Sequence, residues 1–266
     1  MTSIAVVTGA GRGLGRLIAE RLAARGLAVL CTDIDGDAAA ATATAIGGGA
    51  WSMVHDVRDP DAHRAVAAAA AARGPVAAWV NNAGVLAVGL TWEQDDATIR
   101  RMVEVDLLGV IWGARAAIDV MRADGGHLIN IASISSLVPA PGLAVYGATK
   151  HAVLGFSTSL QGDLDRAGVA IKVSAVCPDA METDMVKGVA HDDASSILFS
   201  AGGKMLRAED VADATVALLD RPRLVTVLPR ARAALVHAFR AFPGLELKVL
   251  ERFHRVGQKV RARRGP

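Results

Sequence analysis

Two kinds of segment alternate along the first 230 residues, and this alternation constrains the fold more than any other feature of the sequence. Short runs rich in β-branched residues are separated by longer stretches rich in alanine and leucine. The short runs are apolar on both faces, as expected of parallel strands that helices cover on both sides. The expected strands are Ile4–Thr8, Ala28–Asp33, Trp51–Asp56, Ala78–Asn81, Gly126–Ala132, Ile171–Cys177 and Leu224–Leu228. The expected helices are Gly13–Arg25, Gly36–Ile46, Pro60–Arg73, Ala97–Met121, Ala144–Arg166 and Ala208–Leu219.

This order of elements predicts an α/β protein with a doubly wound, Rossmann-type parallel sheet in three layers, α/β/α. A length of 266 residues with 52% apolar residues fits one large domain and excludes global disorder. We expect a single domain at residues 1–230 and a basic C-terminal extension at residues 231–266. The charge divides in the same way, since residues 1–220 carry a net charge of −8 and residues 221–266 one of +10.

The two cysteines, Cys31 and Cys177, lie far apart inside apolar runs and match neither a disulfide framework nor a metal-ligand spacing. We therefore expect a reducing, cytoplasmic environment and no metal site. The chain enters strand-like sequence at Ile4, so we expect no secretory leader. No run is long and apolar enough to predict a membrane-spanning helix.

The first expected strand ends in a glycine-rich turn, Thr8-Gly9-Ala10-Gly11-Arg12-Gly13-Leu14-Gly15. Glycines let the backbone approach a pyrophosphate closely, and the helix that follows offers unpaired N–H groups and a partial positive charge. A glycine turn between a strand and a helix is the context that nucleotide binding requires. We expect five residues of the turn to contact a dinucleotide, namely Gly9, Arg12, Gly13, Leu14 and Gly15.

The second expected strand ends at Asp33, and this carboxylate bears on which dinucleotide is bound. A carboxylate in this place accepts hydrogen bonds from the ribose hydroxyls of NAD and repels the 2′-phosphate of NADP. Arg12 favours the opposite choice, because a guanidinium can pair with that phosphate. The sequence favours NAD and leaves NADP open.

The chain contains a single tyrosine, Tyr146, and Lys150 follows it by four residues in an expected helix. Side chains at this spacing share one face of a helix. A free phenol has a pKa near 10, and a neighbouring ammonium lowers the pKa toward the range that acid–base catalysis needs. Ser133 lies just beyond the fifth expected strand, at the edge where open α/β sheets bind ligands.

Taken in order, these motifs resemble those of the short-chain dehydrogenase/reductase family in its compact form of about 250 residues. The resemblance spans Ile4–Leu228 and includes Asp56-Val57 after the third strand and Asn81-Asn82-Ala83-Gly84 after the fourth. It implies a catalytic set of Ser133, Tyr146 and Lys150, with Lys150 also holding the nicotinamide ribose. It further implies cofactor contacts from Asp56, Val57, Asn81, Ala83, Gly84, Tyr146, Lys150, Pro178, Met181 and Thr183. A homo-oligomer, either a tetramer or a dimer, is implied as well.

Two positions depart from the family pattern. Asp106 stands where the family has a catalytic Asn whose backbone holds a water, and its carboxylate can attract Lys150 and weaken the effect of Lys150 on Tyr146. We keep Asp106 as a weaker catalytic candidate. Asp179 follows Pro178 where the family usually has Gly, so it is either a substrate contact or a turn residue.

Residues 180–206 form a long segment without an expected element, and three of the seven methionines fall in it. Long loops in compact domains are often lids or binding loops, and methionine adapts to varied apolar shapes. This favours a lipophilic small-molecule substrate, although the same residues can simply pack the loop onto the body. The expected substrate contacts are Leu86, Ser133, Ser135, Leu143, Asp179 and Met185.

The basic extension carries apolar residues at helical spacing, including Leu235, Phe239, Phe253 and Val260. Such a segment can dock on the acidic body or a second subunit, lie peripherally on an anionic membrane surface, or remain solvated. No nucleic-acid partner is expected, because the extension lacks a stacking platform or a known binding motif.

The sequence therefore predicts an NAD(P)-dependent oxidoreductase that interconverts a secondary alcohol and a ketone. Two other functions stay open at this point. One is a protein that binds NAD without turnover, which the aspartates at positions 106 and 179 favour. The other is a reductase of acyl-thioester-linked ketones, in which the basic extension attracts an acidic carrier.

Overall fold

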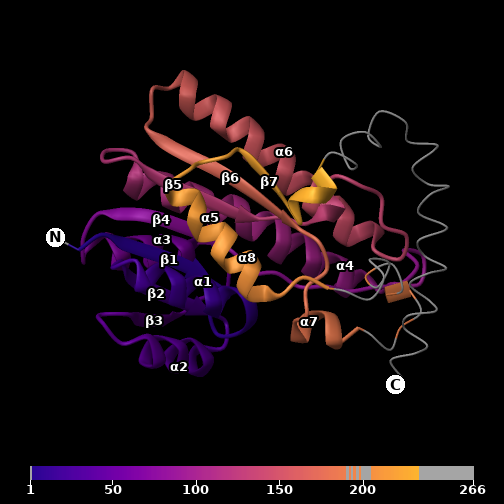
Figure 1. Ribbon diagram of the computed structural model, residues 1–266. Coiled ribbons are helices and arrows are strands. Elements are labelled where there is room, and N and C mark those ends of the chain that lie inside the picture. The colour runs from indigo at the N-terminus through magenta and orange to yellow at the C-terminus, as the bar shows by residue number, and fades with distance from the viewer. Residues whose placement is uncertain (1, 190–191, 193, 196–197, 199–204, 234–266) are drawn as a thin grey trace.

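The computed structural model describes residues 2–189, 192, 194–195, 198 and 205–233, and within them it has the expected three layers (Figure 1). Seven parallel strands form one sheet in the order β3-β2-β1-β4-β5-β6-β7. The strands are β1 Ile4–Thr8, β2 Ala28–Asp33, β3 Trp51–Val54, β4 Val76–Asn81, β5 Gly126–Ile131, β6 Ile171–Pro178 and β7 Val225–Leu228. The helices are α1 Gly13–Ala24, α2 Gly36–Ile46, α3 Pro60–Ala71, α4 Asp96–Val103, α5 Gly109–Met121, α6 Ala144–Arg166, α7 Asp184–Lys187 and α8 Ala208–Val216.

Alternate residues of each strand point to opposite faces of the sheet, so each face has its own apolar core. On one face, Val7 of β1 packs in a cluster with Ile18 of α1 and Val211 of α8. On the other face, Val6 packs in a cluster with Val66 of α3 and Ala117 of α5, which Leu164 of α6 also joins. Because both faces are covered, the strands are apolar throughout, which is the pattern that predicted the fold.

The order of the strands fixes where a ligand can bind. The chain builds β1, β2 and β3 outward and then returns to place β4 on the other side of β1. The loops after β1 and β4 therefore diverge and leave a crevice at the carboxyl ends of the strands.

The expected single helix Ala97–Met121 is wrong in one respect, because a π-helical turn at Glu104–Leu108 separates α4 from α5. The turn carries Asp106, whose Oδ1 accepts a hydrogen bond from the Val85 backbone N–H at 2.7 Å. Single π-turns inside helices insert one residue locally and occur often at functional sites. Here the turn directs a carboxylate inward, toward the segment that follows β4.

Candidate active site

A cavity of about 1120 Å³ opens at the carboxyl ends of the strands, and it contains nearly every residue that the sequence singled out. Pockets for a single drug-sized ligand have about 300–1,000 Å³, so this one has room for a dinucleotide and a second molecule. The predicted residues that line it are Gly9, Arg12, Gly13, Leu14, Gly15, Asp33, Asp56, Val57, Ala83, Gly84, Leu86, Ser133, Ser135, Leu143, Tyr146, Lys150, Pro178, Asp179, Met181, Thr183 and Met185. Asn81 and Asp106 do not line the cavity.

The glycine turn packs tightly against its own backbone at Gly15, whereas the space around Gly13 is open. A Cβ on Gly15 would lie 2.1 Å from the Gly9 carbonyl oxygen, so only glycine fits there. Gly13 has a φ of +54°, and a Cβ on it would meet nothing within 4 Å. Arg12 precedes α1 without capping it through its side chain, and the first turn of α1 carries no acidic residue. The helix N-terminus thus faces the cavity with N–H groups available for an anion.

Asn82 braces this turn from the end of β4, whereas the sequence pointed to Asn81. The Asn82 side-chain N–H₂ donates to the carbonyl oxygens of Thr8 at 2.9 Å and Gly9 at 3.1 Å. Asn81 is buried on the α5 side of the sheet, where its amide bonds to Asn130 and to the indole N–H of Trp79. Side chains alternate along a strand, so Asn81 points to the same face of the sheet as Trp79 and Asn82 points to the opposite face. This alternation could have identified Asn82, and not Asn81, as the residue next to the glycine turn.

Asp33 is held at the rim of the cavity by two backbone donors. Its Oδ2 accepts from the Gly11 N–H at 2.9 Å, and its Oδ1 accepts from the Asp35 N–H at 3.1 Å. The carboxylate is therefore fixed next to the glycine turn. This is the placement that a ribose-binding residue requires.

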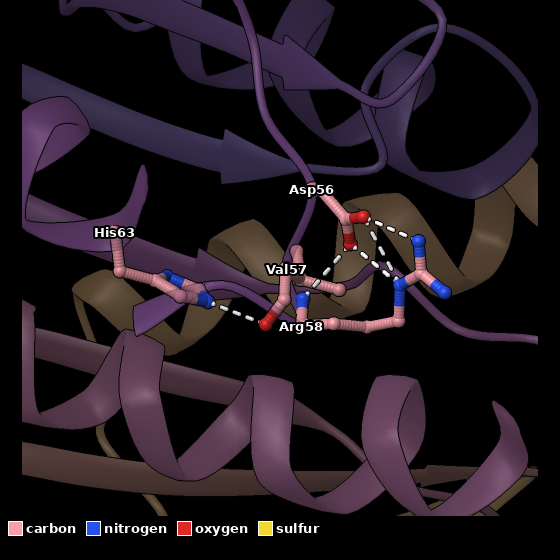
Figure 2. A network of polar contacts seen from close by, with 4 residues as sticks. All are labelled: Asp56, Val57, Arg58 and His63. Atoms are coloured by element: carbon pink, nitrogen blue, oxygen red, sulfur yellow. Dashed lines mark hydrogen bonds and ion pairs between the residues drawn. The ribbon is translucent and has the colours of Figure 1, made fainter. Parts of the chain in front are cut away.

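A second polar network follows β3 and joins Asp56, Val57, Arg58 and His63 (Figure 2). The Arg58 guanidinium pairs with the Asp56 carboxylate at 2.5 Å and holds the pKa of that carboxyl below its usual range. The carbonyl oxygen of Val57 accepts from the ring Nε2–H of buried His63 at 3.0 Å, and burial lowers the pKa of His63. The turn Asp56–Arg58 replaces the expected end of the third strand, which stops at Val54.

The three catalytic candidates come from two neighbouring elements. Ser133 follows β5, whereas Tyr146 and Lys150 lie one turn apart on α6, with the Lys150 ammonium 5.6 Å from the centre of the Tyr146 ring. The ammonium donates to the Ile131 carbonyl at 3.2 Å, so the end of β5 anchors it. The Ser133 hydroxyl accepts from the Ser135 N–H at 3.1 Å.

In the protein alone, the pKa of Tyr146 lies above its usual value. Burial raises it most, Lys150 opposes that effect, Asp106 adds to it, and a hydrogen bond with Ser133 lowers it. The predicted influence of Lys150 is therefore present but smaller than the cost of burying a phenolate.

Comparison with known proteins places these features in a family. The family model for the short chain dehydrogenase matches residues 3–194. The chain belongs to this family. It is 36% identical over 219 residues to 1-deoxy-11-beta-hydroxypentalenate dehydrogenase of Streptomyces exfoliatus, with 79% of this chain and 77% of that protein covered. It is also 36% identical over 196 residues to trans-4-hydroxycyclohexanecarboxylate dehydrogenase of Sinomonas cyclohexanicum, covering 70% and 75% of the two chains.

A solved structure agrees with the fold as well. The crystal structure of a short chain dehydrogenase/reductase from Burkholderia phymatum in complex with NAD superimposes with a TM-score of 0.82 and 30% identity, over 89% of this chain and 92% of that chain. This short-chain dehydrogenase is thus an NAD(P)-dependent oxidoreductase acting on hydroxyl and keto groups. Within the described residues, no helix could cross a membrane, and no cluster of three metal-ligating side chains exists.

Parts of two predicted regions lie outside the described residues. In the expected substrate loop, Val189 and Leu198 line the cavity beside Met181 and Met185, whereas residues 190–191, 193, 196–197 and 199–204 lie outside the described residues. In the basic extension, Leu235, Phe239, Phe253 and Val260 are likewise outside them. Its first residues are described, and Arg232 among them lines the cavity. The sequence did not single out Arg232.

Asp106 is fully buried below the catalytic residues, with 0% of its surface exposed. Burial raises the pKa of its carboxyl, against the opposing effects of Lys150 and of the hydrogen bond from Val85. Its Oδ2 has no hydrogen-bond partner among the described residues. Asp106 therefore does not line the cavity, and its charge raises the pKa of Tyr146 from a distance.

This placement gives a prediction with a defined sign. Removing the charge with Asp106→Asn lowers the pKa of Tyr146, because the carboxylate disfavours the phenolate. Since Tyr146 is the single tyrosine of the chain, phenolate absorbance during an alkaline titration reports its pKa directly. Lys150→Met is the opposing control, for which the pKa rises. A titration curve of Asp106→Asn that stays unchanged or moves to higher pH contradicts this account.

Proposed function

We propose that the chain oxidises a cyclic, lipophilic secondary alcohol, or reduces the matching ketone, with NAD as the favoured cofactor. The observation that carries this proposal is the convergence of Ser133, Tyr146 and Lys150 on one cavity with the glycine turn and Asp33. The residues proposed to bind the cofactor, the residues proposed to transfer the proton and the apolar residues all line this one cavity. A binding protein without turnover has no need of the catalytic set.

The residues of the cavity fit NAD(P). The open N-terminus of α1 and the space above Gly13 suit the pyrophosphate, and the carboxylate of Asp33 suits the ribose hydroxyls. We propose adenine contacts for Asp56 and Val57 and a contact of Lys150 with the second ribose, since all three line the cavity. Further contacts are proposed for Arg12, Leu14, Ala83, Gly84, Pro178, Met181 and Thr183. The nicotinamide of bound NAD(P) supplies the hydride acceptor or donor, and its positive charge in the oxidised form favours a phenolate nearby.

The chain's own residues manage the proton. We propose that Tyr146 takes the hydroxyl proton of the alcohol during oxidation and returns it to the oxygen during reduction. Ser133 donates a hydrogen bond to the same oxygen and so orients the reacting carbon. Lys150, held by the Ile131 carbonyl, opposes the rise in the Tyr146 pKa that burial causes. Family membership supports turnover over the alternative of a nucleotide-binding protein without activity.

The cofactor choice is testable at Asp33. Asp33→Ser is expected to lower the ratio of kcat/KM for NAD over NADP by about 10- to 100-fold, because a charged hydrogen-bond pair is lost and a repulsion is removed. The matched control is Asp37→Ser, which removes an exposed carboxylate of α2 that does not line the cavity. Steady-state kinetics with both cofactors measure the ratio. An unchanged ratio in Asp33→Ser would assign the discrimination to another group, such as Arg12.

The walls of the cavity support a lipophilic substrate. Leu86, Val138 and Leu143 line the same cavity as the catalytic residues, as do Met185 and Val189. Two of the relatives are named for substrates built on rings, which supports a cyclic alcohol. The first experiment is a panel of cyclic and acyclic secondary alcohols with NAD, followed by the absorbance of the reduced nicotinamide. Turnover of acyclic thioester-linked substrates alone would contradict the proposal.

Two further expectations stay predictions. One is a homo-oligomer, and the other is peripheral membrane contact through residues 231–266. The charge of +10 on residues 221–266 supports the second, since a basic amphipathic segment is attracted to anionic lipid. Sedimentation of the full chain with anionic vesicles tests it.

A further inference from the structure

Asp179 and Arg232 form an ion pair inside the catalytic cavity. The Arg232 guanidinium donates through Nη1 to Asp179 Oδ2, and both residues line the space that holds Tyr146 and Ser133. The Asp179 side chain is 15% exposed and that of Arg232 is 34% exposed.

The topology places the pair at the substrate end of the cavity. β5, β6 and β7 are neighbours in the sheet, and Asp179 follows β6 as Ser133 follows β5. The Asp179 N–H donates to the Leu228 carbonyl at 2.9 Å, which ties the end of β6 to the end of β7. Arg232 lies shortly after the end of β7, on the segment that starts at Pro229, and is therefore at the same edge of the sheet as Ser133.

The pair leaves an anion-binding group facing the cavity. Both Asp179 oxygens are occupied, because Oδ1 accepts from the Ala180 N–H at 2.8 Å and Oδ2 accepts from Arg232. A guanidinium has five N–H donors, and the side chain of Arg232 bonds to Asp179 alone among the described residues. Asp179 thus fixes the orientation of the guanidinium, whose other donors have no partner within the described part of the chain.

We propose that Arg232 binds a carboxylate of the substrate, so that the dehydrogenase acts on a hydroxy acid or the matching oxo acid. This inference rests on the proposed function and specifies its substrate class. A guanidinium matches a carboxylate with two parallel N–H···O bonds, and partial burial strengthens such bonds. The apolar wall formed by Leu86, Leu143 and Met185 then accommodates the carbon skeleton between the carboxylate and the reacting hydroxyl.

The test uses two ligands of one shape that cannot react. Cyclohexanecarboxylate and cyclohexanecarboxamide differ in charge, and both lack a hydroxyl group. Isothermal titration of the full chain, with NAD present and absent, gives a dissociation constant for each. We expect the acid to bind the wild-type protein about ten-fold or more tightly than the amide. In Arg232→Met this preference is lost.

Arg230→Met is the matched control, because Arg230 is exposed on the same segment and does not line the cavity. It is expected to keep the wild-type preference for the acid. Equal binding of acid and amide to the wild-type protein, absence of binding by the acid, or an unchanged preference in Arg232→Met overturns the proposal. The proposed function fails separately, by absence of Tyr146-dependent turnover, since this binding experiment requires no reaction.

Discussion

Replacing Tyr146 by Phe is expected to lower kcat for alcohol oxidation by about 10²- to 10⁴-fold, the usual contribution of a positioned acid–base group. The phenol oxygen is the group that exchanges the substrate proton in this account, and Phe keeps the ring while removing that oxygen. Tyr146 lines the cavity next to Ser133 and Lys150. The measurement is steady-state kinetics at saturating cofactor, on the best alcohol of the panel.

The control for this variant separates chemistry from binding. The thermal midpoint of unfolding is expected to remain near the wild-type value, because the ring still fills its place on α6, and the dissociation constant for NAD is expected to change far less than kcat, because only one of many cofactor contacts is lost. A variant that loses cofactor binding along with activity would show that Tyr146 acts through structure. In that case the role of proton donor would have to be assigned elsewhere.

Gly15→Ala is expected to reduce both stability and cofactor affinity. Its Cβ would lie 2.4 Å from Asn82 Nδ2 and 2.1 Å from the Gly9 carbonyl oxygen, and the second contact is with backbone, so no rotamer change relieves it. Separating α1 from the turn costs about 1–3 kcal/mol of unfolding free energy, as overpacking of a tight interior does. It also displaces the N–H groups proposed to hold the pyrophosphate. Urea unfolding and NAD titration measure the two effects.

Gly155→Ala provides the matched control, because a Cβ on this glycine of α6 meets nothing within 4 Å. Alanine favours helix over glycine by up to about 1 kcal/mol, so this variant is expected to be slightly more stable than the wild type. NAD affinity is expected to stay unchanged. Equal unfolding free energies and equal NAD affinities of the two alanine variants would show that the close approach of Gly15 to Gly9 matters for neither stability nor cofactor binding.

The sequence predicted the layers and the place of the cavity because those follow from local patterns. Apolar runs such as Val6 and Val7 in β1 fill both faces of the sheet, and the alternation with helices determines the parallel topology. The glycine turn, Asp33 and the Tyr146–Lys150 spacing are equally local. Each lies at a strand end or on one helix face, where position in the sequence determines position in space.

The details that sequence could not supply depend on contacts between distant segments. Asp106 is drawn inward by the Val85 N–H, and the helix accommodates it with a π-turn that no periodicity in residues 97–121 indicates. Arg232 reaches Asp179 across 53 positions because β6 and β7 pair side by side. The raised pKa of Tyr146 likewise depends on burial, which the sequence does not show and which outweighs the lowering effect of Lys150.

Isotope transfer shows whether this chain transfers hydride with Tyr146 as its acid–base group. A cyclic secondary alcohol deuterated at the carbinol carbon is incubated with NAD and the wild-type protein, and deuterium on the nicotinamide is followed by NMR. The account predicts that deuterium appears on the nicotinamide with the wild type and about 10²-fold or more slowly with Tyr146→Phe. Transfer by Tyr146→Phe at the wild-type rate would contradict it.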